Sequence, residues 1–288
     1  MNCAALILHY NNTSLLDGVL TSLRGEEGLD AIVVIDNAST DTSITHLKTH
    51  HHDVEIIQNK ENLNYGTAYN RAIATRSEEI ILILNNDTIV HPGSVKAAVG
   101  FLRDNLDVAS VSFEGLDRNK GSQPFPCNPC GPIRKFGKVL SPGRSFSSRF
   151  DAPVDARYYL WGAACAIRKD IFMRVKFDES MDWYFEDIDL GWSIRRKTGM
   201  KNVFIPSATI YHEESTTSRS RFDELRISRM STRNAIISFS KNGTLLDWLR
   251  GLPAILLYFL QMQDRRKLAS LVFRNVLERI NCNRNHRM

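Results

Sequence analysis

The stretch Ile80-Ile-Leu-Ile-Leu-Asn-Asn-Asp87 decides the fold class, because five apolar residues are followed at once by three polar ones. An apolar run of this length with polar flanks is typical of a strand buried on both faces of a parallel sheet. In open α/β sheets, ligands bind beyond the carboxyl ends of the strands. Asp87 is therefore a candidate ligand, although Asp at a strand end can also serve as a turn or helix cap.

Strand-like and helix-like segments alternate over the first hundred residues. Further strands are predicted at Ala4–His9, Ala31–Ile35 and Val54–Ile57. Helices are predicted after Asn11-Asn12-Thr13, after Ser39 or Thr40, over Tyr65–Thr75 and after His91-Pro92-Gly93. This alternation predicts an α/β fold with a mostly parallel sheet flanked by helices on both faces.

The second half of the chain changes character twice. Residues 114–155 are dominated by Gly, Pro, Ser and Arg, and they predict a long loop. Regular structure is predicted again from Trp161 to about His212, with a helix over Glu186–Lys197 and strand-like runs at Val203–Ile205 and Thr209–Tyr211. We expect one domain at 1–215, with halves at about 1–113 and 156–215, and a helical C-terminal appendage at 216–288.

The charge of the chain is unevenly distributed. From Arg219 onward, 14 Lys and Arg stand against 5 Asp and Glu, while the rest of the chain carries 23 against 27. A basic tail suggests an anionic partner, although a solvated basic helix explains it equally simply. No recognisable nucleic-acid motif is present, so nucleic acid is not an expected partner.

Peripheral attachment to an anionic membrane is the expected role of this tail. In that hypothesis Leu245–Phe273 lies on the bilayer, and four basic side chains sit at headgroup level: Arg250, Arg265, Arg266 and Lys267. The alternatives are packing on the catalytic domain or a homodimer interface. No segment approaches the roughly 20 apolar residues that span a bilayer, and the first ten residues lack the basic start of a signal peptide. We therefore expect a reduced, cytoplasmic protein, which in the membrane hypothesis is peripheral on the inner face of the membrane.

Sequence motifs for phosphate and metal binding are mostly missing. The chain has neither GxGxxG nor GxxxxGK[ST], the two Gly-rich phosphate loops. A bound diphosphate would then need a divalent cation, Mn²⁺ or Mg²⁺, which one or two carboxylates can hold. Asp87 is the natural ligand. Cys127 and Cys130 form a single CxxC with no second pair, so they do not supply the four ligands of a zinc site.

A second acidic cluster comprises Asp178-Glu179 and Glu186-Asp187-Ile188-Asp189, with Trp183, Tyr184 and Phe185 between them. Acids in the first turn of a helix complement its dipole, which accounts for one of them but not for five. Carboxylates beside aromatic rings suit a sugar site, because rings stack on apolar sugar faces and carboxylates accept hydroxyl hydrogen bonds. Trp183 is accordingly a candidate acceptor-site residue.

These motifs, taken in order, resemble the inverting GT-A glycosyltransferases of family 2, particularly the branch of bacterial rhamnosyltransferases and related polysaccharide enzymes. The resemblance covers roughly residues 4 to 215. It rests on Tyr10-Asn11, Asp36-Asn37-Ala38-Ser39-Thr40-Asp41, Glu61-Asn62-Leu63, Leu84-Asn85-Asn86-Asp87-Thr88, Trp161-Gly162-Ala163, Phe177-Asp178-Glu179, Glu186-Asp187-Ile188-Asp189-Leu190 and His212.

The resemblance implies an enzyme that transfers a sugar from a UDP- or dTDP-sugar to a hydroxyl of a glycan or lipid-linked acceptor, in surface polysaccharide synthesis. Asp187 is then the general base, with Glu186 its neighbour, and Asp87 binds the metal with His212. Donor contacts are expected at Tyr10, Asp36, Asn37, Gly66, Asn70, Asn85 and Asn86. Trp161 and Gly162 line the junction with the acceptor.

Two positions depart from the family pattern. Asn85 replaces the first Asp of the DxD motif, which removes one charge from the metal site. Asn64 stands where relatives carry Gly, and Asn tolerates a left-handed backbone next best. The alternative functions are a nucleotidyltransferase, which would carry a Gly-rich, basic phosphate loop after the first strand, and a non-catalytic nucleotide-sugar-binding protein.

Overall fold

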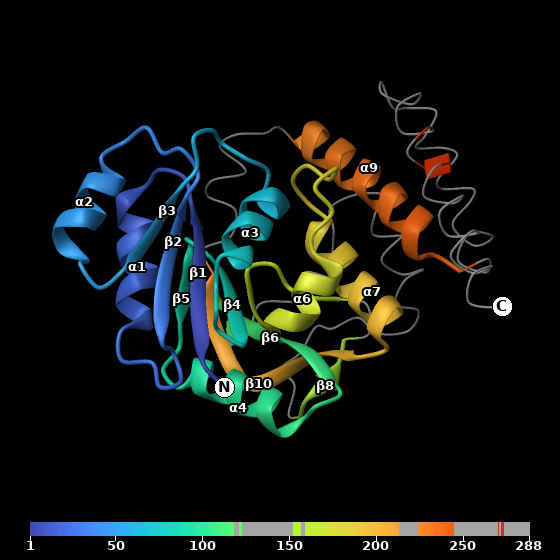
Figure 1. Cartoon of the computed structure of the whole chain (residues 1–288), viewed down its shortest axis with the longest axis horizontal. Helices are drawn as coiled ribbons and strands as arrows, with labels where there is room; N and C mark the ends of the chain where they lie inside the picture. Colours follow the sequence, from blue (N-terminus) through green and yellow to red (C-terminus); the bar gives the residue numbers. More distant parts are fainter. Residues whose placement is uncertain are drawn as a thin grey trace. The chain divides into compact units, whose positions relative to one another are not determined.

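The computed structural model describes residues 1–117, 121–122, 152–156, 159–212, 224–244, 270 and 272–273 (Figure 1). These residues form two compact units. The first contains the described residues up to 182 and those of 186–212, and the second contains 183–185 and the described residues from 224 onward. The predicted loop with Cys127 and Cys130 lies almost entirely outside the described residues, as does the boundary at 215, so the predicted domain division stays a prediction.

The first unit is built on a mixed sheet, whose main path in the described chain runs β3-β2-β1-β4-β9-β6-β10-β5. Its first half is parallel and consists of β1 (Cys3–His9), β2 (Ala31–Asp36), β3 (Glu55–Gln58) and β4 (Ile80–Asn85). The register aligns His9 with Asp36 and Leu8 with Asn85, so these strands end together. The predicted strands are confirmed, and their polar ends meet as expected.

The other half of the sheet is mostly antiparallel. It contains β5 (Thr88–Val90), β6 (Val108–Asp117) and β9 (Ala164–Arg168), and the long strand β10 (Lys201–His212). The short strands β7 (Gly121–Ser122) and β8 (Val154–Asp155) pair with β6 and β10. β9 runs antiparallel to β4 and β6, whereas β10 is parallel to β6. The sheet is therefore mixed rather than mostly parallel.

Helices cover both faces of this sheet. Figure 1 shows α1 (Thr13–Leu23) and α2 (Ser43–His50) on one face, and α3 (Tyr65–Ala74), α6 (Lys169–Val175) and α7 (Glu186–Thr198) on the other. α4 (Ser94–Asp104) packs against β6 and β10. The central strands β1 and β4 are buried on both faces, as their continuous apolar runs predict, whereas the edge strand β3 is partly exposed.

Two local predictions need correction, and one short strand was not predicted. Residues 114–117 belong to β6 rather than to a loop, because Glu114 to Leu116 pair with β10. The two strand-like runs near 203–211 form one strand, β10, with an irregular register between Phe204 and Thr209, where Pro206, Ser207 and Ala208 separate the two runs. The short strand β5 was not predicted, because three residues show no period.

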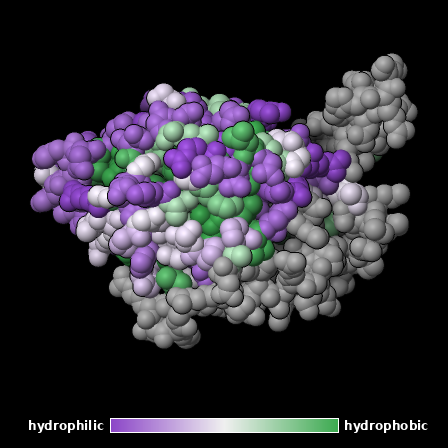
Figure 2. Space-filling model, turned by 90° about the horizontal axis from the view of Figure 1, so that it is seen from below, coloured by the Kyte–Doolittle hydropathy of each residue, from purple (hydrophilic) through white to green (hydrophobic). Residues whose placement is uncertain are grey.

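The second unit contains the helix α9 (Glu224–Asn242), which confirms helical structure in the basic region. Most of Leu245–Phe273, with Arg250, Arg265, Arg266 and Lys267, lies outside the described residues. Among the described helices, none combines the length and hydropathy needed to cross a bilayer. On the face drawn in Figure 2, hydrophilic side chains cover most of the described surface, with hydrophobic areas between them.

Candidate functional site

Asp87 and His212 are brought together by strand pairing at the end of the sheet. β4 ends at Asn85, and β5 begins at Thr88, directly after Asp87. β5 pairs antiparallel with the last residues of β10, and the register places His212 opposite Thr88. The last residue of β10 is therefore delivered to the side of the aspartate that follows β4.

The Oδ1 atom of Asp87 lies 3.2 Å from Nε2 of His212, and both side chains are largely buried. The pair is close enough for an ion pair but is not aligned as a hydrogen bond. Ligand atoms that each sit about 2.1 Å from one divalent cation are separated by roughly 3 Å. The spacing, burial and donor types therefore fit two ligands of a single cation.

Asp187 stands beside the segment that precedes β9. Its Oδ2 accepts the backbone N–H of Gly162 at 3.1 Å, and its Oδ1 accepts the N–H of Ile188 at 2.7 Å. A Cβ on Gly162 would lie 3.1 Å from Cβ of Asp187, and the hydroxyl of Tyr65 donates to the Gly162 carbonyl at 2.7 Å. Glycine at position 162 therefore lets the Asp187 carboxylate approach this backbone, whereas any larger residue would displace a neighbour.

The same segment, residues 161–163, also contacts the Asp87–His212 pair. The ring of Trp161 packs edge-on against His212, with ring centroids 5.7 Å apart. The backbone N–H of Trp161 donates to the hydroxyl of Ser112. Ala163 accepts the N–H of Asn85 at 3.0 Å. Residues 161–163 thus connect the Asp87–His212 pair with Asp187, and their place at a donor–acceptor junction stays a prediction.

Glu186 and Asp187 lie with protein atoms on most sides, although each keeps some exposure to solvent. Burial raises the pKa of Glu186 well above its usual range, and the neighbouring charge of Asp187 raises it further. Burial also raises the pKa of Asp187, and the N–H groups of Gly162 and Ile188 partly offset this. Since only Asp187 has these donors, Asp187 ionises first and Glu186 holds its proton to higher pH.

The turn before this pair belongs to the second unit and has an unusual backbone. Tyr184 and Phe185 have φ angles of 73° and 74°, a left-handed conformation that is costly for side chains of this size. In α9, Asn234 is fully buried and donates its amide to the carbonyls of Trp183 at 3.3 Å and Tyr184 at 2.7 Å. Asn234 therefore holds the turn from which Glu186 and Asp187 follow, and sequence reasoning did not single it out.

The expected nucleoside side is formed by the loops after β1 and β2. Asp36 is buried; it accepts the N–H of Ser39 at 2.9 Å and the side-chain amide of Gln58 at 3.2 Å. The side chain of Asn11, in turn, accepts the N–H of Thr40 at 2.8 Å. Tyr10 precedes Asn11 and is half-buried. Asp36 and Tyr10 thus lie on adjacent loops that are joined by hydrogen bonds.

Asn37 organises the neighbouring loop. Its Oδ1 accepts from Asn59 and from the N–H of Leu63, and its Nδ2 donates to Asn62 and to the Leu63 carbonyl. These four bonds use the whole hydrogen-bonding capacity of the amide. Its geometry supports a positioning role, and direct contact with a donor stays a prediction.

The α3 residues of the expected donor site hold the segment 177–179. Asn70 exchanges hydrogen bonds with the backbone of Phe177 and donates to the Glu179 carboxylate at 3.0 Å. A Cβ on Gly66 would lie 2.8 Å from Cβ of Phe177, so only Gly fits this contact. Asn64 caps α3 with φ −67° and therefore needs no left-handed backbone, contrary to the expectation from the sequence.

Asn86 contacts a residue that the prediction left out. Its amide lies 3.2 Å from Nδ1 of His9, and both side chains are buried. Nε2 of His9 is buried and makes no hydrogen bond within the described part of the chain. Burial lowers the pKa of His9, so its ring stays neutral. His9 is one residue from the predicted Tyr10, and its apolar neighbours in β1 made it look like part of the strand.

Comparison with known proteins gives the family of this chain. The family model of glycosyl transferase family 2 matches residues 5–176, which is more than half of the chain. N-acetylglucosaminyl-diphospho-decaprenol L-rhamnosyltransferase of Mycobacterium tuberculosis is 27% identical over 229 residues, covering 70% of this chain and 73% of that protein. An uncharacterized Sinorhizobium fredii protein is 25% identical over 72% of this chain and 24% of its own length.

Solved structures share the fold at low identity. S. aureus TarS 1–349 in complex with UDP-GlcNAc gives a TM-score of 0.61 at 14% identity, over 91% of this chain and 73% of that one. GalNAc-T7 with UDP, GalNAc and Mn²⁺ gives 0.59 at 14%, over 83% of this chain and 48% of that chain. The mannosyltransferase PcManGT from Pyrobaculum calidifontis, with GDP-Man and Mn²⁺, gives 0.55 at 16%, over 96% and 87%. With its GT-A fold and its family-model match, this chain belongs to glycosyl transferase family 2.

Proposed function

We propose that this glycosyltransferase moves a sugar, with inversion, from a UDP- or dTDP-sugar to a hydroxyl of a glycan or lipid-linked acceptor. The observation that carries the proposal is the placement of two functional groups on either side of residues 161–163. The Asp87–His212 pair touches Trp161, and Asp187 bonds to Gly162. A leaving diphosphate and an attacking hydroxyl need such separate partners.

The known proteins support the donor and acceptor classes. The Mycobacterium tuberculosis relative is named for a rhamnosyl transfer to a diphospho-decaprenol-linked sugar. Solved structures of the same fold hold UDP, UDP-GlcNAc or GDP-Man, two of them with Mn²⁺. The first comparison supports a lipid-linked acceptor, and the second supports a nucleoside diphosphate sugar as donor. The role in surface polysaccharide synthesis is part of the proposal.

The donor diphosphate would lie beyond β4, with Asp87 and His212 as the cation's ligands and Asn85 and Asn86 beside them. Bound there, Mn²⁺ or Mg²⁺ supplies positive charge that stabilises the departing diphosphate. Asp36 and Tyr10 are proposed to receive the nucleoside. β2 and β4 are two strand spacings apart, roughly 10 Å, which separates the base and phosphate sites.

Asp187 is proposed as the general base. The acceptor oxygen forms a bond to the anomeric carbon as the bond from that carbon to the phosphate oxygen breaks, and the diphosphate leaves with the electron pair. The hydroxyl proton passes to Asp187 as attack makes it acidic. Because attack comes from the face opposite the leaving group, a single displacement inverts the anomeric configuration. The Gly162 N–H fixes the carboxylate for this transfer.

Calorimetry with UDP and dTDP, each with and without Mn²⁺, tests the donor site. Wild type should bind one of them in a metal-dependent manner, and Asp87→Ala should lose this binding. Asp104→Ala, an exposed aspartate paired with Arg103, is the matched control and should bind normally. Absence of UDP and dTDP binding by folded wild type would contradict a UDP- or dTDP-sugar donor. Metal-dependent binding without sugar transfer would favour the non-catalytic nucleotide-sugar-binding alternative, and release of pyrophosphate from a nucleoside triphosphate and a sugar phosphate would favour a nucleotidyltransferase.

The basic C-terminal region is proposed to attach the enzyme to an anionic membrane, where lipid-linked acceptors reside. The excess of Lys and Arg beyond Arg219 supports this proposal. Flotation with liposomes that contain or lack anionic lipid tests it. Binding to neither kind of liposome would contradict membrane attachment and leave a dimer interface or packing on the catalytic domain as the explanation.

A further inference from the structure

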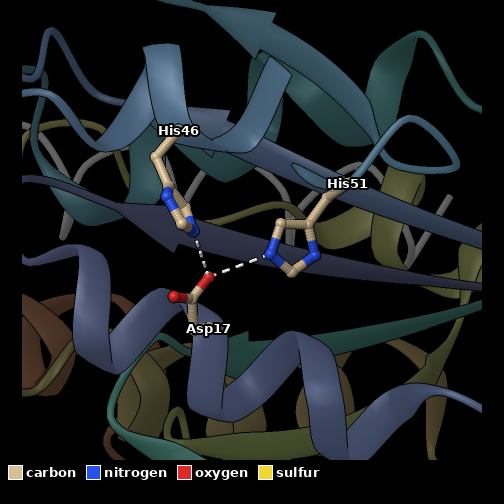
Figure 3. Close-up of side chains that lie close together, drawn as sticks. All are labelled: Asp17, His46 and His51. Carbon is tan, nitrogen blue, oxygen red and sulfur yellow. Dashed lines mark hydrogen bonds and ion pairs between the residues drawn. The ribbon is translucent and has the colours of Figure 1, made fainter. Parts of the chain in front are cut away.

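Asp17, His46 and His51 form a cluster that the proposed reaction does not use. Asp17 comes from α1, His46 from α2, and His51 from the residue that ends α2. Figure 3 shows the three side chains pointing toward one another. The Nε2 atoms of His46 and His51 lie 3.0 Å and 2.9 Å from the same Oδ1 atom of Asp17. All three of these atoms fall within 4.8 Å of one another.

We propose that this cluster binds a divalent zinc-type cation that links α1 to α2. Imidazole nitrogens and a carboxylate oxygen are typical zinc ligands, at about 2.0–2.2 Å from the ion. Tetrahedral ligands at such distances are separated by roughly 3.3 Å, so the two histidine–aspartate distances need only a small expansion. Asp17 and His46 are partly exposed, which leaves a route for the ion and a fourth position for water.

The surroundings of His51 prepare it as a ligand. The ring is buried, and Nη2 of Arg24 lies 3.0 Å from its Nδ1, which fixes the ring orientation. Without an ion, Arg24 donates to Nδ1, so Nε2 carries the hydrogen and donates to Asp17. When zinc binds Nε2, the ring stays neutral, its hydrogen moves from Nε2 to Nδ1, and Arg24 turns to the carboxylate of Asp53, 3.7 Å away.

This site differs from the donor site in position and in chemistry. It shares no residue and no helix or strand with Asp87 and His212. Two imidazoles favour zinc over Mg²⁺, which prefers oxygen ligands and retains its waters. α1 starts after Asn12 and α2 after Thr42, and the N–H of Asn12 donates to the carboxylate of Asp41, which precedes Thr42, at 2.8 Å. Asp17 and His46 lie about one helical turn into α1 and α2. A cation bound there would therefore stabilise the two loops that precede these helices and flank the expected nucleoside position.

Zinc titration of the chelator-stripped full-length chain, against a chromophoric competitor, tests the proposal. One zinc should bind per chain, a large excess of Mg²⁺ should not displace it, and Co²⁺ in its place should give the intense visible absorption of a four-coordinate site. Because Asp87→Ala retains the cluster, the same zinc should bind in that variant, which separates this site from the donor site.

Two variants identify the ligands. His46→Gln and Asp17→Asn change partly exposed side chains with little change of shape, and each should weaken zinc binding by roughly 100-fold or more. His52→Gln, an exposed histidine next to the cluster, is the matched control and should keep full affinity. Thermal unfolding should show zinc stabilising wild type but not Asp17→Asn. Equal weak binding in all variants, or no binding to wild type, would overturn the proposal.

Discussion

The backbone N–H of Gly162 donates to Oδ2 of Asp187 at 3.1 Å, and the Cα of Gly162 faces the same side chain. A methyl group there would lie 3.3 Å from Oδ2 of Asp187 and 3.4 Å from the Tyr65 hydroxyl. The contact with Asp187 is tighter than ordinary packing, and its carboxylate is also held by the N–H of Ile188. Gly162 therefore fixes the position of the carboxylate through its lack of a side chain.

Gly162→Ala should lower kcat on the order of 10²-fold, because small displacements of a reacting group are costly. The overpacking should also reduce the free energy of unfolding by about 1–3 kcal/mol. Steady-state kinetics and urea unfolding measure the two effects. Gly100→Ala is the control: its added Cβ meets nothing within 4 Å, and Ala favours the helix α4. Similar kinetics for Gly162→Ala and Gly100→Ala would remove the positioning role.

Asp187→Asn and Glu186→Gln should differ strongly in activity. Loss of a general base costs about 10²–10⁴-fold, so Asp187→Asn should fall in that range. Glu186 holds its proton to higher pH than Asp187, and Gln imitates the protonated form, so Glu186→Gln should lose much less. Because burial raises the pKa of Asp187, the acidic limb of the kcat/KM profile should lie above the usual aspartate range. Equal losses in both variants would contradict this assignment.

Glu186 should also make stability depend on pH. Since its folded-state pKa is raised, its contribution to stability is complete below the pKa of the unfolded chain and is lost as pH rises through the folded-state pKa. Glu186→Gln does not titrate. Relative to wild type, the variant should therefore gain stability as pH rises from the unperturbed glutamate pKa, about 4.3, through the raised folded-state pKa of Glu186. A difference in unfolding free energy between variant and wild type that stays the same at every pH would argue against a buried carboxyl.

Local patterns explain which parts of the fold could be predicted. The strands of the parallel half are apolar runs with polar ends, and each run carries its own signal in a few consecutive residues. The approach of Asp87 to His212 has no such signal, because it depends on β5, three residues long, pairing with the distant end of β10. His212 was therefore a candidate only through resemblance to a family.

Side-chain partners were harder to predict than strand positions. Asn37 and Asn70 look like ligand-binding residues in the sequence, and the structure shows their amides bonded to loops that border the site. The sequence motif is the same for both roles, because an amide binds a backbone and a ligand with the same groups. His9 was missed because its apolar neighbours in β1 make it look like part of the strand. Asn234 was missed because its partners, the carbonyls of Trp183 and Tyr184, lie about 50 residues away in the sequence.

Asn234→Ala should disturb the turn that precedes Glu186. The variant leaves the carbonyls of Trp183 and Tyr184 without their shared amide donor, in a turn that already has two left-handed residues. A loss of about 1–3 kcal/mol in unfolding free energy is expected, with a fall in kcat larger than any change in donor KM. Ser240→Ala is the matched control from α9, because it also removes a buried side-chain donor, a hydroxyl whose acceptor, the Ile237 carbonyl, lies in the same helix. A variant with wild-type kcat would show that the turn holds itself.

Asn64 gives the sharpest contrast between the family pattern and this structure. If this position needed a left-handed backbone, Asn64→Gly would relieve strain and stabilise the protein. Its φ is −67°, and its side chain accepts the Thr67 N–H at 2.8 Å and donates to the Glu179 carbonyl at 3.1 Å. Gly loses both bonds, so the variant should be less stable by about 0.5–1 kcal/mol, and Asn64→Ala by about 1 kcal/mol.

Asn64→Asp separates the two bonds of this side chain. Aspartate keeps the acceptor for the Thr67 N–H but has no amide to donate to the Glu179 carbonyl. Its stability should therefore fall between those of wild type and Asn64→Ala, in urea unfolding with unchanged m-values. Since Glu179 also accepts from Asn70, weaker attachment of 177–179 should appear in Asn64→Asp as faster amide exchange of that segment. Stabilisation by Gly at this position would show instead that the backbone adopts the left-handed turn of the family pattern.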